Sequence, residues 1–102
     1  MKSVITAELH IVALGTDNTS MSVHISEAVK AIDRAGVKYQ VTPMGTIMEV
    51  SSLDEAFSAV KAAHEALIKK GIKRVVTHLT IDDRRDRPKG MIEKVESVKS
   101  KL

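Results

Sequence analysis

The chain has 102 residues, of which 43% are hydrophobic and 28% are charged; its formal net charge is +3 and it contains no cysteine. This balance is typical of one globular domain, and without cysteine there can be no disulfide, thiol catalysis or Cys-ligated zinc. The sequence has neither an apolar run of about 18 residues nor a signal-peptide pattern at its start. We therefore expect a single cytoplasmic domain over residues 1–102, with no membrane partner.

The charge pattern also argues against a nucleic-acid partner. The basic residues are spread along the chain, and the aromatic residues are Tyr39 and Phe57 alone. Nucleic-acid-binding domains usually show a basic stripe together with aromatic side chains on which bases stack. We expect no nucleic-acid binding.

The first half of the chain predicts a strand, a helix and a second strand. Residues 3–14 alternate between apolar and more polar side chains, as in a half-buried strand. The segment "GTDNTS" then breaks this pattern, and Ser20 or Ser22 is the expected N-cap of a helix that ends near Gly36. Residues 37–41, "VKYQV", alternate again and predict the second strand.

The second half predicts a strand, a helix, a strand and a last short helix. Pro43 and Gly45 mark a turn or bulge before a strand at "TIMEV", residues 46–50. Ser51 or Ser52 is expected to cap the next helix, which ends at Gly71. Its expected buried stripe consists of Leu53, Phe57, Val60, Leu67 and Ile68. A strand at "RVVTHLTI", the charged loop "DDRRDRPKG" and a helix over residues 91–101, with Met91, Val95 and Val98 along one side, complete the chain.

The element order is therefore β-α-β-β-α-β followed by a C-terminal helix. Right-handed crossovers place both main helices on one face of a four-stranded antiparallel sheet, which is the α+β, ferredoxin-like sandwich. The other face of the sheet is expected to carry mixed side chains: Thr6, Glu8, His10, Val12, Val76, His78 and Thr80. Such a face is too apolar to remain in water, so we expect a homo-oligomer that pairs sheets, with a ligand near the junction.

Glu49 is the most unusual residue of the strand at 46–50. If the helices cover Thr46, Met48 and Val50, the Glu49 carboxylate lies on the open face of the sheet. It is then either a solvated strand-end group or ion-pair partner, or a partly desolvated carboxylate that binds a cation or accepts a strong hydrogen bond. Glu8 is its expected neighbour, on the assumption that the first and third strands run parallel.

The remaining candidates favour structural roles. The loop at residues 15–22 offers hydroxyls and amides at a helix N-terminus, where anions or polar ligand groups can bind, although ordinary capping explains it. His10 and His78 are expected on neighbouring strands, but no histidine pair has the i, i+4 helical spacing of a zinc motif, so no metal is expected. His64 is expected at the edge of the core, and the charges of residues 82–87 are expected either to pair within their loop or to form an intersubunit contact.

Several segments together resemble the small thiamine-binding protein family. They are "TAELHIVALGT" with "TSMSVHI", "PMGTIMEV" followed by "DEAFSAVKAAHEAL", and "LTIDDRRD" with "KVESVK", which cover nearly the whole chain in order. The resemblance implies a ferredoxin-like fold, assembly into dimers and tetramers through the sheets, no enzymatic activity and no cofactor. It also implies binding of thiamine or its hydroxymethylpyrimidine part.

The same resemblance implies a set of ligand-binding residues. Thr46 and Glu49 fall on the "MGT..E" positions with Met44 and Gly45 beside them, and Ser20 and Ser22 fall on the hydroxyl-rich loop after Gly15 and Thr16. Glu8 joins this set as the expected neighbour of Glu49. A carboxylate suits the thiazolium cation or the aminopyrimidine, and the hydroxyls would fix the orientation of the ligand. The alternative is a metal-binding or regulatory homo-oligomer that uses Glu8, His10 and His78.

Overall fold

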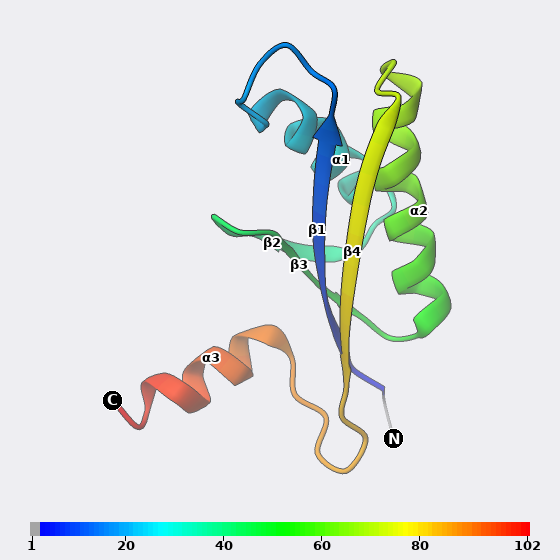
Figure 1. The fold of residues 1–102 in the computed structure, drawn as a ribbon. Helices are drawn as coiled ribbons and strands as arrows, with labels where there is room; N and C mark the ends of the chain where they lie inside the picture. The colour runs from blue at the N-terminus through cyan, green and yellow to red at the C-terminus, as the bar shows by residue number, and fades with distance from the viewer. Residues whose placement is uncertain (1–2) are drawn as a thin grey trace.

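The computed structural model describes residues 3–102 and contains every expected element, with ends shifted by a few residues (Figure 1). In chain order these are β1 (Ile5–Leu14), α1 (Ser22–Arg34), β2 (Lys38–Val41), β3 (Thr46–Val50), α2 (Leu53–Lys69), β4 (Arg74–Asp83) and α3 (Met91–Lys99).

The four strands form one antiparallel sheet in the order β2-β3-β1-β4. Helices α1 and α2 lie together on one side of it. Helix α3 extends away from the lower part of β1 and β4, whereas α1 lies near their upper part (Figure 1). This is the predicted ferredoxin-like α+β fold. The expectation that the first and third strands run parallel is wrong: β1 and β3 are antiparallel. The crossover through α1 returns the chain parallel to β1 in β2, and the tight hairpin then reverses it in β3.

The alternation along β1 and β3 separates the two faces of the sheet as predicted. Ile5, Leu9, Met48 and Val50 are buried under the helices. Glu49 therefore lies on the open face, where its partner on the neighbouring strand β1 is Thr6. Because side chains alternate strictly along a strand, this assignment follows once Met48 is buried.

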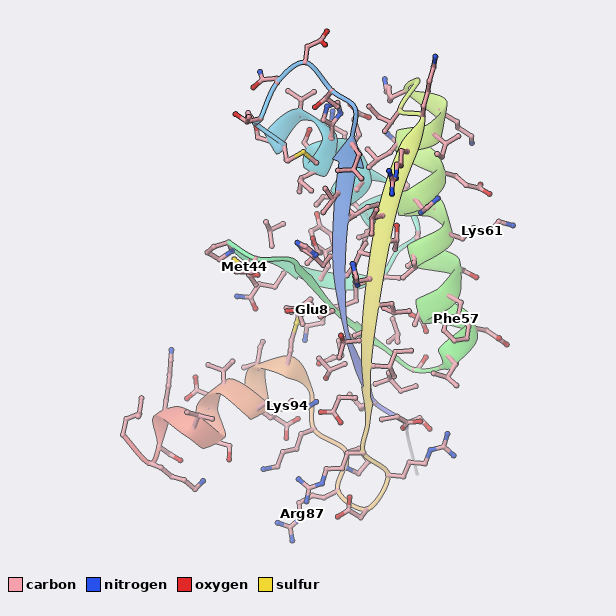
Figure 2. All side chains as sticks on the ribbon, viewed as in Figure 1. Glu8, Met44, Phe57, Lys61, Arg87 and Lys94 are labelled. Atoms are coloured by element: carbon pink, nitrogen blue, oxygen red, sulfur yellow. The ribbon has the colours of Figure 1, made fainter. Side chains whose placement is uncertain are left out.

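The buried stripe of α2 matches the predicted one at Leu67 and, with partial burial, at Val60, but differs elsewhere. Its buried residues are Ala56, Ala59, Ala63 and Leu67, whereas Leu53, Phe57 and Ile68 are exposed. Figure 2 shows Phe57 on the side of α2 that faces away from the sheet. A row of alanines allows a helix backbone to lie close to its neighbours, so the larger side chains of α2 turn outward. The apolar side of α3 is also mostly exposed, with Met91 as its buried residue.

The start of α2 is capped by Ser52, one of the two expected residues. The Ser52 hydroxyl accepts a hydrogen bond from the Glu55 amide at 3.1 Å, and Glu55 Oε2 accepts from the Ser51 amide at 3.2 Å. At α1 the expected cap is wrong, because Met21 occupies the N-cap position without a side-chain hydrogen bond and Ser22 is already helical. Asn18 organises this loop instead, since its Oδ1 accepts from the Ser20 amide at 2.9 Å.

Substitution of the α2 cap should be measurable. Ser52→Ala removes the acceptor for the Glu55 amide and should lower the free energy of unfolding by about 1 kcal/mol. Urea unfolding followed by circular dichroism measures the change. The control is Ser58→Ala in the exposed middle of the same helix, which should be neutral or slightly stabilising because alanine favours helix. Equal losses in both variants would contradict the capping role.

Candidate functional site

β1 is longer than its neighbour β3, and this difference in length creates the candidate site. Pairing of β1 with β3 ends at Leu9 and Thr46, whereas its pairing with β4 continues to Leu14. Residues 10–14 of β1 therefore have a neighbouring strand on one side only. On the other side, the β2–β3 turn and the start of α1 enclose a cavity of about 210 Å³. We call it the hairpin cavity; it is lined by Leu9, His10, Ile11, Val12, Met21, Ile25, Ala28, Val41, Thr42, Pro43, Met44, Gly45 and Thr46.

Thr42 holds the turn that forms one wall of the hairpin cavity. Its hydroxyl donates to the Gly45 carbonyl at 2.7 Å and accepts from the Met44 and Gly45 amides at 3.3 and 3.1 Å. The Thr42 amide also donates to the Gly45 carbonyl, at 2.9 Å. These bonds give the turn a defined shape before any ligand arrives.

Gly45 is needed at this turn for reasons of space. A Cβ at this position would lie 3.0 Å from the Leu9 carbonyl oxygen and 3.4 Å from Cγ of Glu8. The Leu9 oxygen belongs to the backbone of a central strand and cannot move aside cheaply. Glycine therefore lets the turn lie directly against β1.

Three of the predicted ligand-binding residues lie together in the hairpin cavity: Met44, Gly45 and Thr46. Thr46 is buried and faces the helices. Met44 lies at the tip of the hairpin with most of its side chain exposed (Figure 2). The cavity wall contributed by α1, which includes Met21 and Ile25, was missed by sequence reasoning, because only the crossing of α1 over β1 brings it there.

Glu49 lies outside this group and holds α3 instead. Its Oε1 accepts a hydrogen bond from the Met91 amide at 2.9 Å, and its Oε2 is 3.5 Å from Nζ of Lys38. A Cβ on Gly90 would overlap Oε1 of Glu49, so the glycine allows the carboxylate to reach the helix N-terminus. A carboxylate there satisfies a free amide and interacts favourably with the helix dipole.

A second polar contact fastens α3 to the open face. Nζ of Lys94 donates to Oδ2 of Asp82 at 2.6 Å and to Oγ1 of Thr6 at 2.9 Å. Figure 2 shows Lys94 on α3 beside the lower part of the long strands. The contacts of Glu49 and Lys94 together position the C-terminal helix.

Glu8 also lies on the open face, beside the turn but on the other side of the sheet from Thr46. It pairs with Ile47 of β3, and the cross-strand partner of Glu49 is Thr6. The antiparallel register therefore does not set the two carboxylates directly opposite each other.

The remaining predicted residues lie in the loop between β1 and α1. The Ser20 and Ser22 hydroxyls are 3.4 Å apart. Thr16 donates to the Asn18 carbonyl at 2.8 Å and lines a separate surface hollow with Gly15. The structure does not bring these residues into the hairpin cavity.

The histidines are placed as expected. His10 and His78 are directly paired across β1 and β4 on the open face, with ring centroids 5.9 Å apart. His64 lies at the core boundary, its Nδ1 2.6 Å from Oγ1 of Thr77. Within residues 3–102, no group of three or more metal-ligating side chains is arranged to hold an ion.

Two ion pairs form within the charged loop after β4, as predicted, whereas Asp82 pairs with Lys94 of α3. Arg84 donates to Asp86 at 2.9 Å, and Arg85 donates to Asp83 at 2.9 Å. The hydrogen bond from Arg84 lowers the pKa of the Asp86 carboxyl. These pairs are exposed to solvent, so they shape the loop and add little to stability.

The structure defines a ferredoxin-like α+β protein, and its similarity to known proteins supports a small-molecule-binding role. The chain belongs to the thiamine-binding protein family, whose model matches residues 7–99. A UPF0045 protein of Methanothermobacter thermautotrophicus is 50% identical over 97% of this chain and 100% of its own length. Across the part of the chain that the structure describes, no helix has the length and hydrophobicity required to span a membrane.

Two solved structures share the fold along nearly their full length. The protein MJ1052 of Methanocaldococcus jannaschii has a TM-score of 0.85 and 31% identity, covering 96% of this chain and 97% of its own. A Thermotoga maritima protein, described as having a proposed role in thiamine biosynthesis or salvage, has a TM-score of 0.76 and 26% identity. That match covers 93% of this chain and 98% of the other.

Proposed function

We propose that this protein binds thiamine, or its hydroxymethylpyrimidine part, in the hairpin cavity and catalyses no reaction on it. The observation that carries the proposal is the meeting of Met44, Gly45 and Thr46 around one preformed cavity. Membership of the thiamine-binding family supports the choice of ligand.

The walls of the cavity suit a flat heteroaromatic ring. Met21, Ile25 and Val41 supply apolar surface, and methionine adapts its shape to ring faces. Thr46 adds a hydroxyl at the base of the turn. A mostly apolar cavity with a few placed polar groups is the usual form of a small-molecule site.

The proposal includes a homo-oligomer, a dimer of dimers, that covers the open face of the sheet. That face carries the apolar side chains of Val12, Ile47 and Val76 between its polar ones. Helix α3 exposes Ile92, Val95 and Val98 next to it. A second copy covering these side chains would remove apolar surface from water, the main driving force of association. Light scattering of the purified protein measures the assembly state.

Isothermal titration calorimetry with thiamine and with hydroxymethylpyrimidine measures whether either molecule binds, and variants on the two faces of the sheet test where it binds. Thr46→Val keeps the shape of the side chain but removes the hydroxyl, and should weaken binding about fivefold, the effect of one lost hydrogen bond. The matched variant is Glu49→Gln on the opposite face, which should leave affinity within about twofold. Loss of binding in Glu49→Gln alone would move the site to the open face, and no binding in the unmodified protein would reject the proposal.

A second candidate function, metal binding, is favoured by the pairing of His10 with His78. Two imidazoles at this separation supply two ligands, and water or a second copy would have to complete the shell. Zinc titration of the unmodified protein and His78→Ala separates the two functions, because His78 does not line the hairpin cavity. If the pair binds zinc, His78→Ala should abolish zinc binding and leave thiamine binding intact. His24→Ala on α1 is the control, and equal zinc affinity in all three proteins would reject this function.

A further inference from the structure

The unpaired edge of β1 presents backbone groups to the hairpin cavity. The Leu9 carbonyl oxygen lies 3.0 Å from the position of a Cβ on Gly45, so it points toward the β3 side of the strand. In an antiparallel strand, the N–H and C=O of one residue point to the same side, and this direction repeats every second residue. Ile11 and Ala13 therefore direct their backbone groups to the β3 side, beyond the point where β3 ends.

The two residues that carry these groups are buried, and they lack a partner strand on the β3 side. Ile11 is 5% exposed and Ala13 is 4% exposed. β3 ends at Thr46, opposite Leu9, and the hydrogen bonds of the turn and loops within residues 3–102 do not involve either residue. Buried backbone N–H and C=O groups are nearly always paired, because an unpaired one loses its hydration without compensation. A polar partner is therefore expected at this edge.

The hairpin cavity lies against this edge. Leu9, His10, Ile11 and Val12 all line it, although their side chains alternate between the two faces of the sheet. Four consecutive residues can border one cavity only if it runs along the strand backbone. Ile11, at the centre of the unpaired edge, is thus the residue whose N–H and C=O a molecule in the cavity can reach.

We propose that the backbone of Ile11 recognises the ligand, and that the ligand class is a heteroaromatic ring with an exocyclic amino group next to a ring nitrogen. The amino group donates to the Ile11 carbonyl and the ring nitrogen accepts from the Ile11 amide. The turn residues Thr42 to Thr46 close over the ring from the side of β3. This inference rests on the proposed function and specifies which part of thiamine is read, namely the aminopyrimidine edge.

The geometry also explains how the site does without Phe, Tyr, Trp or acidic and basic side chains other than His10. Pairing with a strand edge gives two hydrogen bonds of fixed direction, and apolar walls provide the ring contacts. A ring bound over the Ile11 carbonyl shuts water away from it, so leaving that carbonyl without a donor costs more than one ordinary hydrogen bond contributes. A ring that lacks the amino group should therefore bind distinctly more weakly.

The test is amide nuclear magnetic resonance with two pyrimidines. On addition of 4-amino-5-hydroxymethyl-2-methylpyrimidine, the Ile11 amide signal should shift and its hydrogen exchange should slow. The Leu9 amide, which faces the paired part of the edge, should change little. The analogue without the 4-amino group should bind about tenfold more weakly or worse.

Each outcome decides between the two proposals. Binding of the aminopyrimidine with an unchanged Ile11 amide, or equal affinity for both pyrimidines, overturns recognition by the β1 edge and leaves vitamin binding in place. If neither pyrimidine nor thiamine binds, both proposals fall. Thr46→Val provides a further control, because it should weaken both pyrimidines by a similar factor while the Ile11 amide still responds.

Discussion

Replacing Leu67 by alanine is expected to lower the free energy of unfolding by about 3 kcal/mol. Leu67 is fully buried, and the other buried residues of its helix α2 are all alanines. It is therefore the one large side chain among the buried residues of α2, and small neighbours cannot fill the space that it leaves. Truncating a buried leucine loses its transfer free energy and leaves a cavity.

The adjacent residue provides the control for this prediction. Ile68 is 46% exposed on the outer side of the same helix, so Ile68→Ala should cost less than about 1 kcal/mol. Chemical denaturation of both variants, with the slope against denaturant compared, measures the difference. Similar losses in the two variants would contradict the placement of α2 against the sheet.

Replacing Ala28 by leucine is expected to reduce affinity for thiamine by about tenfold or more. Ala28 is buried on α1 and lines the hairpin cavity. The substitution puts an isobutyl group where a methyl group stood, and this group enters the space proposed for the ligand. Because the cavity can accept the added atoms, the thermal midpoint should be unchanged or raised, unlike an overpacked core.

Ala62→Leu is the matched control for the cavity substitution. Ala62 lies on α2 in a surface groove between the two helices, and none of the residues that line this groove lines the hairpin cavity. The same chemical change there should leave thiamine binding within about twofold. Full affinity in Ala28→Leu, measured by calorimetry on a variant with an intact thermal transition, would place the ligand elsewhere.

The comparison of sequence and structure is clearest at Glu49. The alternation of "TIMEV" was sufficient to place its carboxylate on the open face, because a strand has a strict period of two residues. The partner of that carboxylate, the Met91 amide, is 42 residues away in the chain. No local pattern connects the two, so the role of Glu49 in holding α3 depended on the path of the loop after β4.

The amino-acid sequence by itself determined the order of elements, the fold class and the faces of β1, β3 and β4, because these follow from local periodicity. Capping chemistry narrowed the start of α2 to Ser51 or Ser52, and the structure chose Ser52. The sequence also carried the family resemblance. Tertiary structure alone decided the antiparallel register of β1 and β3, the exposure of Phe57 and the hairpin cavity. The cavity exists because β1 extends past the end of β3 while α1 crosses above it, and such a difference between paired lengths appears only when strands that are distant in sequence come together.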